Sequence, residues 1–237
     1  MSSSESHEVE LDRVRTVFAD RRRDVDPDFY AFHHPANLFL RHGQERAIVW
    51  ALNRLGMTPL RDKAVLDVGC GEGNWIAAFD FLGAPRERAA GVDLMEERVE
   101  CCRRRFPQAD VRVADAAKLP WDDESFDLVS QFTVFTSVLD DDLKQAIAAE
   151  MLRVLRPGGA IAWGDFLYNN PRNPNVRGIG MREIKRLFPG CVPCLRKVTL
   201  APPLARRIVP VSWTLAAWLE SLGIFNTHYF GLIHKPQ

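Results

Sequence analysis

A glycine-rich turn that links a short apolar run to a helical segment is the feature that most constrains the fold of this chain. Residues 64–68 read AVLDV, and residues 69–75, which follow directly, read GCGEGNW. Alternating glycines let the backbone turn through positive φ angles, and the start of the following helix offers unpaired N–H groups to a ligand. The pattern therefore predicts a strand, a ligand-binding turn and a helix in immediate succession.

Strand and helix patterns continue to alternate through the middle of the chain. Further strands are predicted at residues 89–93, 110–115, 126–130 and 160–163, and helices at residues 75–82, 96–106 and 141–155. Such alternation is typical of a parallel sheet with helices on both faces. Two later strand patterns, at residues 195–200 and 226–234, lack a complete crossover helix of the usual kind between them, which indicates an antiparallel pair. We expect a doubly wound, mostly parallel, Rossmann-like α/β sheet of seven strands that ends in this pair.

The predicted sheet defines one domain with additions. Residues 59–237 form the α/β domain, with a helical insertion at about 201–225. Residues 11–58 form an N-terminal helical cover, and the polar residues 1–10 form a flexible tail. The helix pattern at 211–222 presents an apolar face, which we expect to pack beside the sheet; a lid over a substrate, a partner subunit and a membrane surface are the alternatives.

Composition excludes several classes of protein. The 237 residues include 31 Lys and Arg and 31 Asp and Glu, so the net charge is zero, and 46% of the residues are hydrophobic. This balance excludes global disorder and disfavours a protein that coats nucleic acid. No stretch approaches the roughly 18 unbroken apolar residues of a membrane helix, and the polar N-terminus has no signal-peptide core, so we expect a cytoplasmic protein without stable membrane association. The five scattered cysteines are interpreted as free thiols, and no metal site is expected.

Carboxylates at the ends of three predicted strands indicate the charge of the ligand. Asp67 lies two residues before the first glycine of the turn, Asp93 ends the second strand, and Asp115 ends the third. An acid at the position of Asp93 suits ribose hydroxyls, while Asp115 and the N–H of Ala116 suit the amine and a ring nitrogen of a base. Parallel strands end at one edge of a sheet, so these groups should meet there. Because Asp67 would repel a pyrophosphate, a dinucleotide-dependent oxidoreductase is disfavoured and a positively charged ligand is favoured.

The whole set of motifs resembles the class I S-adenosylmethionine-dependent methyltransferases. The matching segments are VLDVGCGEG at residues 65–73, GVD at 91–93, ADA at 114–116 and VLRPGG at 154–159. The resemblance implies S-adenosylmethionine as cofactor, S-adenosylhomocysteine as product and a small-molecule substrate. It implies that Asp67 and the glycines lie near the aminoacid part of the cofactor, Asp93 at the ribose and Asp115 at the adenine. The expected cofactor contacts are Asp67, Gly69, Cys70, Gly71, Gly73, Asn74, Asp93, Leu94, Asp115, Ala116, Gln131 and, from the N-terminal cover, Tyr30.

The acceptor of the methyl group is predicted from the loop that follows the fifth strand. This loop is polar, and candidate bases lie both before it and in the N-terminal segment, so we expect O-methylation of a hydroxyl on a metabolite or natural product. Asp165 is the first candidate for the general base, and Tyr168 and His34 are the others, whereas His228 is interpreted as buried structure on a terminal strand. The alternatives are C-methylation of a quinone-like or isoprenoid acceptor and a module that binds the cofactor without turnover. A homodimer is considered, and no nucleic-acid partner is expected.

Overall fold

The structure is a computed structural model that describes residues 3–171 and 173–237, and seven strands within these residues form a single mixed sheet. The strand order is β3-β2-β1-β4-β5-β7-β6. The parallel strands are β1 (Val65–Val68), β2 (Ala89–Asp93), β3 (Asp110–Val113), β4 (Phe126–Phe132) and β5 (Leu155–Phe166). β7 (Asn226–His234) runs antiparallel between β5 and β6 (Val192–Leu200). The predicted doubly wound sheet with a C-terminal antiparallel pair is confirmed.

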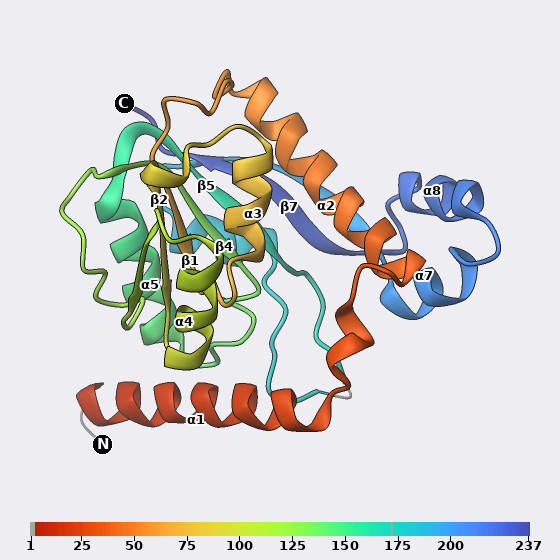
Figure 1. Cartoon of the computed structure of the whole chain (residues 1–237), viewed down its shortest axis with the longest axis horizontal. Helices are drawn as coiled ribbons and strands as arrows, with labels where there is room; N and C mark the ends of the chain where they lie inside the picture. The colour runs from red at the N-terminus through yellow and green to blue at the C-terminus, as the bar shows by residue number, and fades with distance from the viewer. Residues whose placement is uncertain (1–2, 172) are drawn as a thin grey trace.

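Helices cover both faces of this sheet (Figure 1). α2 (Pro35–Arg54) and α3 (Asn74–Phe81) pack on one face, α5 (Asp141–Val154) and α6 (Met181–Leu187) pack on the other, and α4 (Glu96–Arg105) lies along β2 and β3. The run AIAW in β5 shows the cause, because Ala160 and Ala162 join the apolar cluster of α2 while Ile161 and Trp163 join that of α5. Successive side chains of a strand point to opposite faces, so an unbroken apolar run is buried on both.

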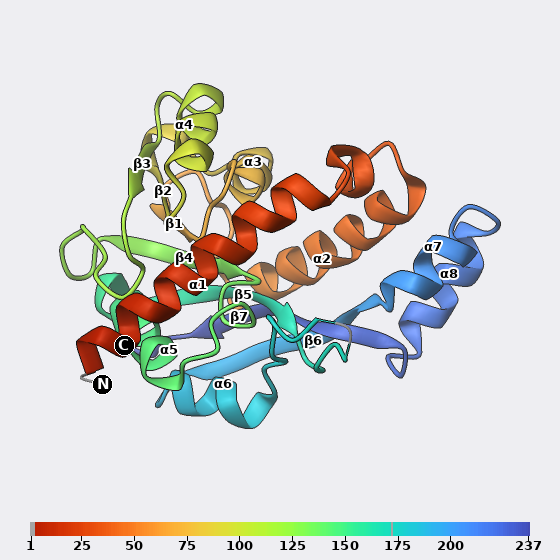
Figure 2. The ribbon, with the colours of Figure 1, turned by 90° about the horizontal axis from the view of Figure 1, so that it is seen from below.

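The N-terminal cover begins earlier than the sequence predicts. α1 (Ser3–Asp24) is helical through residues 3–10, where a flexible tail is expected, and residues 1–2 lie outside the described residues. Figure 2 shows α1 crossing the sheet at its carboxyl edge. Glu10 accepts a hydrogen bond from the N–H of Leu139 at 2.5 Å, and Arg13 donates to the carbonyl of Ser137 at 2.6 Å. These contacts with the segment after β4 order the polar N-terminus, which is followed by a short turn, η1 (Pro27–Tyr30).

The expected insertion at 201–225 contains α7 (Pro202–Ile208) and α8 (Trp213–Ser221), which project beyond the sheet (Figures 1 and 2). The apolar face predicted to pack beside the sheet points outward instead, since Val211 is 85% exposed and Trp218 is 57% exposed. The side that packs inward carries Ala216, whose small side chain allows close approach, and Glu220, which pairs with Arg46 at 2.9 Å. The expected core packing of this helix is therefore corrected.

The described part of the chain also bears on two expected absences. None of its helices is long and apolar enough to cross a membrane. Over the same residues, no group of three or more acidic, histidine or cysteine side chains is arranged to hold a metal ion. All five cysteines are free thiols, as the sequence predicts.

Candidate active site

A cavity with a volume of about 310 Å³ lies at the carboxyl edge of the parallel strands. This volume is at the low end of the range for ligand pockets, about 300–1,000 Å³. One end, which we call the polar end, is built from the segments that follow β1, β2 and β3, with α1 across it. The other end, the aromatic end, is built from β4, β7, α2 and α3. The fold thus places a polar and an apolar binding region in one space.

The glycine turn after β1 is held in place by the next strand. The N–H groups of Gly69 and Cys70 both donate to the carbonyl of Val92, at 2.8 and 3.0 Å. Gly71 has a φ of +53° and Gly73 has a φ of +81°, in the left-handed region that side chains with a Cβ disfavour. Gly73 is also the N-cap of α3. The turn therefore requires glycine for its backbone shape, and Gly69 and Gly71 line the cavity.

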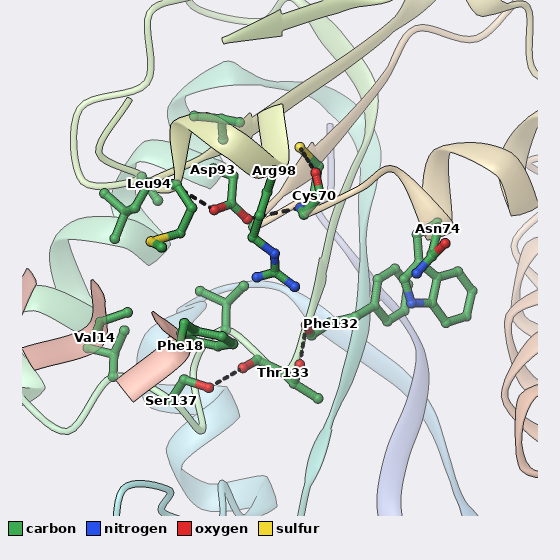
Figure 3. A pocket seen from close by; sticks show the side chains of 18 of the residues that line it. Val14, Phe18, Cys70, Asn74, Asp93, Leu94, Arg98, Phe132, Thr133 and Ser137 are labelled. Carbon is green, nitrogen blue, oxygen red and sulfur yellow. Dashed lines mark hydrogen bonds between the residues drawn. The ribbon is translucent and has the colours of Figure 1, made fainter. Parts of the chain in front are cut away.

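Two of the three predicted carboxylates, Asp93 and Asp115, line the polar end, and Figure 3 shows Asp93 there. Asp93 Oδ1 accepts from the N–H of Met95 and Oδ2 accepts from the N–H of Gly71, both at 2.9 Å. Asp115 Oδ2 lies 2.6 Å from Nε2 of His7 in α1. A carboxylate has about four lone-pair sites, so both acids keep the capacity to accept hydrogen bonds from a ligand.

Asp67, the third predicted acid, lies behind the glycine turn and does not line the cavity. It is 2% exposed, and Ser130 Oγ donates to its Oδ1 at 2.7 Å. Burial raises the pKa of Asp67 to about 7, although the Ser130 hydrogen bond and the positive charge of Arg41 both lower it. Its effect on a cationic ligand is therefore electrostatic, and it strengthens as the pH rises through neutrality.

Two arginines make the charge of the cavity mixed, where the predicted acids alone would make it negative. Arg98 of α4 extends into the cavity (Figure 3), with its guanidinium 5.3 Å from the centre of the Phe18 ring. Arg41 of α2 lies 3.8 Å over the Trp75 ring and donates to the carbonyl of Asn74 at 3.1 Å. A fixed cation near an acid-lined turn suits a ligand group that carries both a carboxylate and an ammonium.

The aromatic end consists of three stacked rings. Trp75 and Phe132 stack with their centroids 3.6 Å apart and 12° between their planes, and Phe132 and Phe230 follow at 5.7 Å and 19°. Gly164 of β5 makes room for this stack, because a Cβ there would lie 2.4 Å from both phenylalanines. Thr133 supplies a polar group at the same end. Such a surface suits a flat, apolar molecule.

His228 lines the aromatic end and is 5% exposed. Its burial matches the interpretation from the sequence, which did not place it at the cavity. Its ring centroid lies 4.0 Å from that of Phe166, the residue opposite it on β5. Burial lowers the pKa of His228 to about 3, so the imidazole is neutral at physiological pH. The aromatic end therefore contains an uncharged nitrogen base.

The residues predicted for cofactor binding fall into two groups. Those that line the cavity are Gly69, Cys70, Gly71, Asn74, Asp93, Leu94, Asp115 and Ala116. Gln131 is fully buried outside the lining, like Asp67, and Gly73 packs against α4, where a Cβ would lie 2.7 Å from the Cys102 sulfur. Tyr30 is 50% exposed and does not line the cavity, whereas Phe32 of the same segment does.

None of the predicted catalytic candidates lines the cavity. Asp165 is fully buried, accepts a hydrogen bond from Thr136 and, as the neighbour of Gly164 on β5, points to the opposite face of the sheet. Tyr168 is 54% exposed, and His34 is exposed at the start of α2. Their positions do not support the roles expected from the sequence.

Further lining residues come from α1 and from segments without a local motif. Leu11, Val14 and Phe18 recur at helical spacing and place the apolar side of α1 on the cavity. Arg41 and His228 carry no local motif, because their neighbours in the cavity come from distant parts of the chain.

The sequence of this chain is similar to those of known proteins. Residues 65–159 match a family model described as a methyltransferase domain. A 27-O-demethylrifamycin SV methyltransferase of Amycolatopsis mediterranei is 32% identical over 191 residues, which cover 73% of this chain and 68% of the relative. The chain belongs to the class I S-adenosylmethionine-dependent methyltransferases.

Two further similarities place the methyltransferase among varied relatives. A demethylmenaquinone methyltransferase of Clavibacter sepedonicus is 30% identical over 183 residues, which cover 74% of this chain and 71% of the relative. A crystal structure of the geranyl diphosphate C-methyltransferase of Streptomyces coelicolor, in complex with S-adenosyl-L-homocysteine, covers 79% of this chain and 76% of that chain with a TM-score of 0.56. At 18% identity, the second similarity shows the shared fold alone.

The methyltransferase takes S-adenosylmethionine as cofactor and leaves S-adenosylhomocysteine as product, and the polar end fits this group. Gly71 opens the turn towards the cavity, since a Cβ there would lie 3.3 Å from the Arg98 guanidinium that extends into it. Asp93 and Asp115 offer acceptors for hydroxyl and amine groups at the ends of successive strands. When bound, the cofactor supplies an electrophilic methyl group on a positively charged sulfur.

Proposed function

We propose that this methyltransferase transfers its methyl group to a hydroxyl oxygen of an apolar, ring-containing small molecule. The observation that carries the proposal is the stack of Trp75, Phe132 and Phe230 in the same cavity as the polar end. Flat apolar molecules bind aromatic side chains by stacking and by burial of apolar surface. A dry aromatic region also favours a reaction in which a charged donor becomes neutral.

We propose the cofactor contacts from the same geometry. Asp93 accepts from the ribose hydroxyls, Asp115 accepts from the adenine amine, and the glycine turn from Gly69 to Gly71 lies against the aminoacid part. Arg41 pairs with the carboxylate of that part, because it is a fixed cation beside the glycine turn and Asn74. His7 contacts Asp115, so α1 takes part in the adenine region.

Relatives support oxygen as the methylated atom without excluding carbon. The relative from Amycolatopsis mediterranei is named for an O-demethyl substrate, while the relative from Clavibacter sepedonicus is named for demethylmenaquinone. C-methylation of a quinone-like acceptor is therefore the second candidate. The aromatic end accommodates both classes of acceptor, so the product must distinguish them.

Methyl transfer from labelled S-adenosylmethionine to a panel of hydroxylated polyketides, hydroquinones and isoprenoids tests the proposal. Mass spectrometry detects the product, and NMR identifies the methylated atom. We expect an O-methyl product with an apolar, ring-containing acceptor. Phe230→Ala should raise the KM for the acceptor, whereas Phe81→Ala, at a side chain that is 89% exposed, is the matched control. Methylation of carbon alone, or tight binding of S-adenosylhomocysteine without transfer to any acceptor, would contradict the proposal.

A further inference from the structure

We infer that His228 is the general base of the methyl transfer and that its Nε2 accepts the proton of the acceptor hydroxyl. The inference rests on the proposed O-methylation and adds a catalytic residue to it. His228 lines the aromatic end, where the acceptor is proposed to bind. The bases expected from the sequence, Asp165, Tyr168 and His34, lie outside the cavity.

Hydrogen bonds around the imidazole of His228 favour one tautomer. Thr227 Oγ1 donates its single proton to the carbonyl oxygen of Thr199 at 3.2 Å. The same hydroxyl lies 2.9 Å from Nδ1 of His228, and with its proton on the Thr199 carbonyl it accepts there, so this arrangement assigns the hydrogen to Nδ1. In a neutral imidazole the other nitrogen then has a free lone pair. Nε2 is therefore the nitrogen that can accept a proton.

The backbone at Thr199 supports this arrangement. Its φ is +69°, in the left-handed region that a β-branched residue rarely adopts. Its N–H donates to Oε1 of Glu220 at 3.2 Å, so its amide is turned away from the ladder between β6 and β7. Strained backbone concentrates at functional sites. Here the strain accompanies a chain of hydrogen bonds from Thr199 through Thr227 to His228, in which the two threonines are positioning residues.

The charges of the reacting groups before and after the transfer are compatible with a buried histidine as the base. Burial lowers the pKa of His228 to about 3, so the imidazole is unprotonated and available at neutral pH. The reacting groups carry one positive charge before the step, on the sulfonium, and one after it, on the imidazole, while the charges of the lining residues stay the same. Because the number of buried charges does not change, the dry aromatic end does not oppose the transfer as it would oppose the creation of a new charge.

The step conserves atoms and electrons. The acceptor oxygen forms a bond to the methyl carbon as its O–H proton moves to Nε2. The bond between the methyl carbon and sulfur breaks, and its electron pair stays on sulfur. The products are the methyl ether and S-adenosylhomocysteine, and the imidazolium releases its proton to water afterwards. General-base catalysis of this kind contributes about 100- to 10,000-fold to a rate.

Two phenols of different acidity test the base with the full-length protein. At pH 8.5, 4-nitrophenol is already ionised and needs no base, whereas 4-methylphenol is protonated. We expect His228→Gln to lower kcat by about 100-fold or more with 4-methylphenol, with little change for 4-nitrophenol or for the affinity of S-adenosylhomocysteine. His234→Gln on the same strand, which does not line the cavity, is the matched control. Equal losses with both phenols, or no loss with 4-methylphenol, would overturn the assignment.

The positioning residues have a readout of their own. In ¹⁵N NMR spectra of the parent protein, His228 should carry its hydrogen on Nδ1. Thr227→Val should reduce turnover of 4-methylphenol and shift the tautomer, and Thr227→Ser should restore both. A hydrogen on Nε2 in the parent protein would overturn the inference while leaving O-methylation intact. A parent protein that methylates carbon but no hydroxyl, including those of the two phenols, would refute the proposed function and the base together.

Discussion

The buried carboxyl of Asp165 should make stability depend on pH in a way that one substitution removes. Burial raises its pKa from the ordinary 3.8 to about 7, against the hydrogen bond from Thr136. The folded state therefore binds the proton more tightly than the unfolded state does. With these two pKa values, complete ionisation lowers the free energy of unfolding by about 4 kcal/mol.

The sign follows from proton binding. Where the folded state holds more protons than the unfolded state, stability falls as the pH rises, so the loss accumulates between about pH 4 and pH 7 and is complete above that. Asp165→Asn keeps the shape of the side chain and its acceptor for Thr136 but cannot ionise. The stability of the variant relative to the parent should therefore increase by about 3 kcal/mol between pH 5 and pH 8.5, or roughly 6–12 °C in Tm for a chain of this size.

Urea unfolding of both proteins at several pH values measures this difference. Asp62→Asn, at a side chain that is 81% exposed, is the matched control and should show no such trend. The titration of Asp67 is common to all three proteins and cancels in the comparison. Parallel stability curves for Asp165→Asn and the parent would refute the reasoning. Because Asp165 does not line the cavity, turnover should change little, and a large loss of kcat would return Asp165 to the list of candidate bases.

Three further substitutions test the polar end and α8. Asp93→Ala should weaken binding of S-adenosylhomocysteine by about 10- to 100-fold in calorimetry, because it removes charged acceptors; unchanged affinity would exclude Asp93 from the ribose site. Gly71→Val should abolish this binding while unfolding stays cooperative, since its φ is +53° and a Cβ would meet Arg98 at 3.3 Å; measurable binding would show that the turn tolerates a side chain. Ser212→Ala removes the hydroxyl that accepts from the N–H of Leu215 at 3.2 Å and should lower the free energy of unfolding by about 1 kcal/mol, with no change in urea midpoint counting against the cap.

Local patterns were sufficient to predict the sheet and the polar end. β1, β2 and the central part of β5 are apolar runs buried on both faces, so these runs are diagnostic, whereas β3 at the edge of the sheet is partly polar and exposed. Gly69 follows β1, Asp93 ends β2 and Asp115 lies two residues after β3, so their meeting at one edge is a consequence of parallel topology. The lining of the cavity confirms their convergence, while their cofactor roles stay predictions.

The aromatic end could not be predicted in the same way. Trp75, Phe132 and Phe230 come from α3, β4 and β7, and they meet because β7 inserts beside β5. His228 faces the cavity because of its register with Phe166, which no pattern within β7 encodes. The helix from residue 11 onward is predicted, but the polar residues 3–10 conceal its first turns, where Glu10 accepts from a backbone N–H far along the chain. Tertiary pairing decided these features.

The modest size of the cavity has a consequence for selectivity. A space of about 310 Å³ must hold both the donor and the part of the acceptor that reacts. Under the proposed O-methylation, a bulky acceptor would therefore insert only a protruding hydroxyl-bearing tip and leave most of its scaffold outside. Under that proposal, reach would then govern regiochemistry, and among many similar hydroxyls the one furthest from the molecular framework would be favoured.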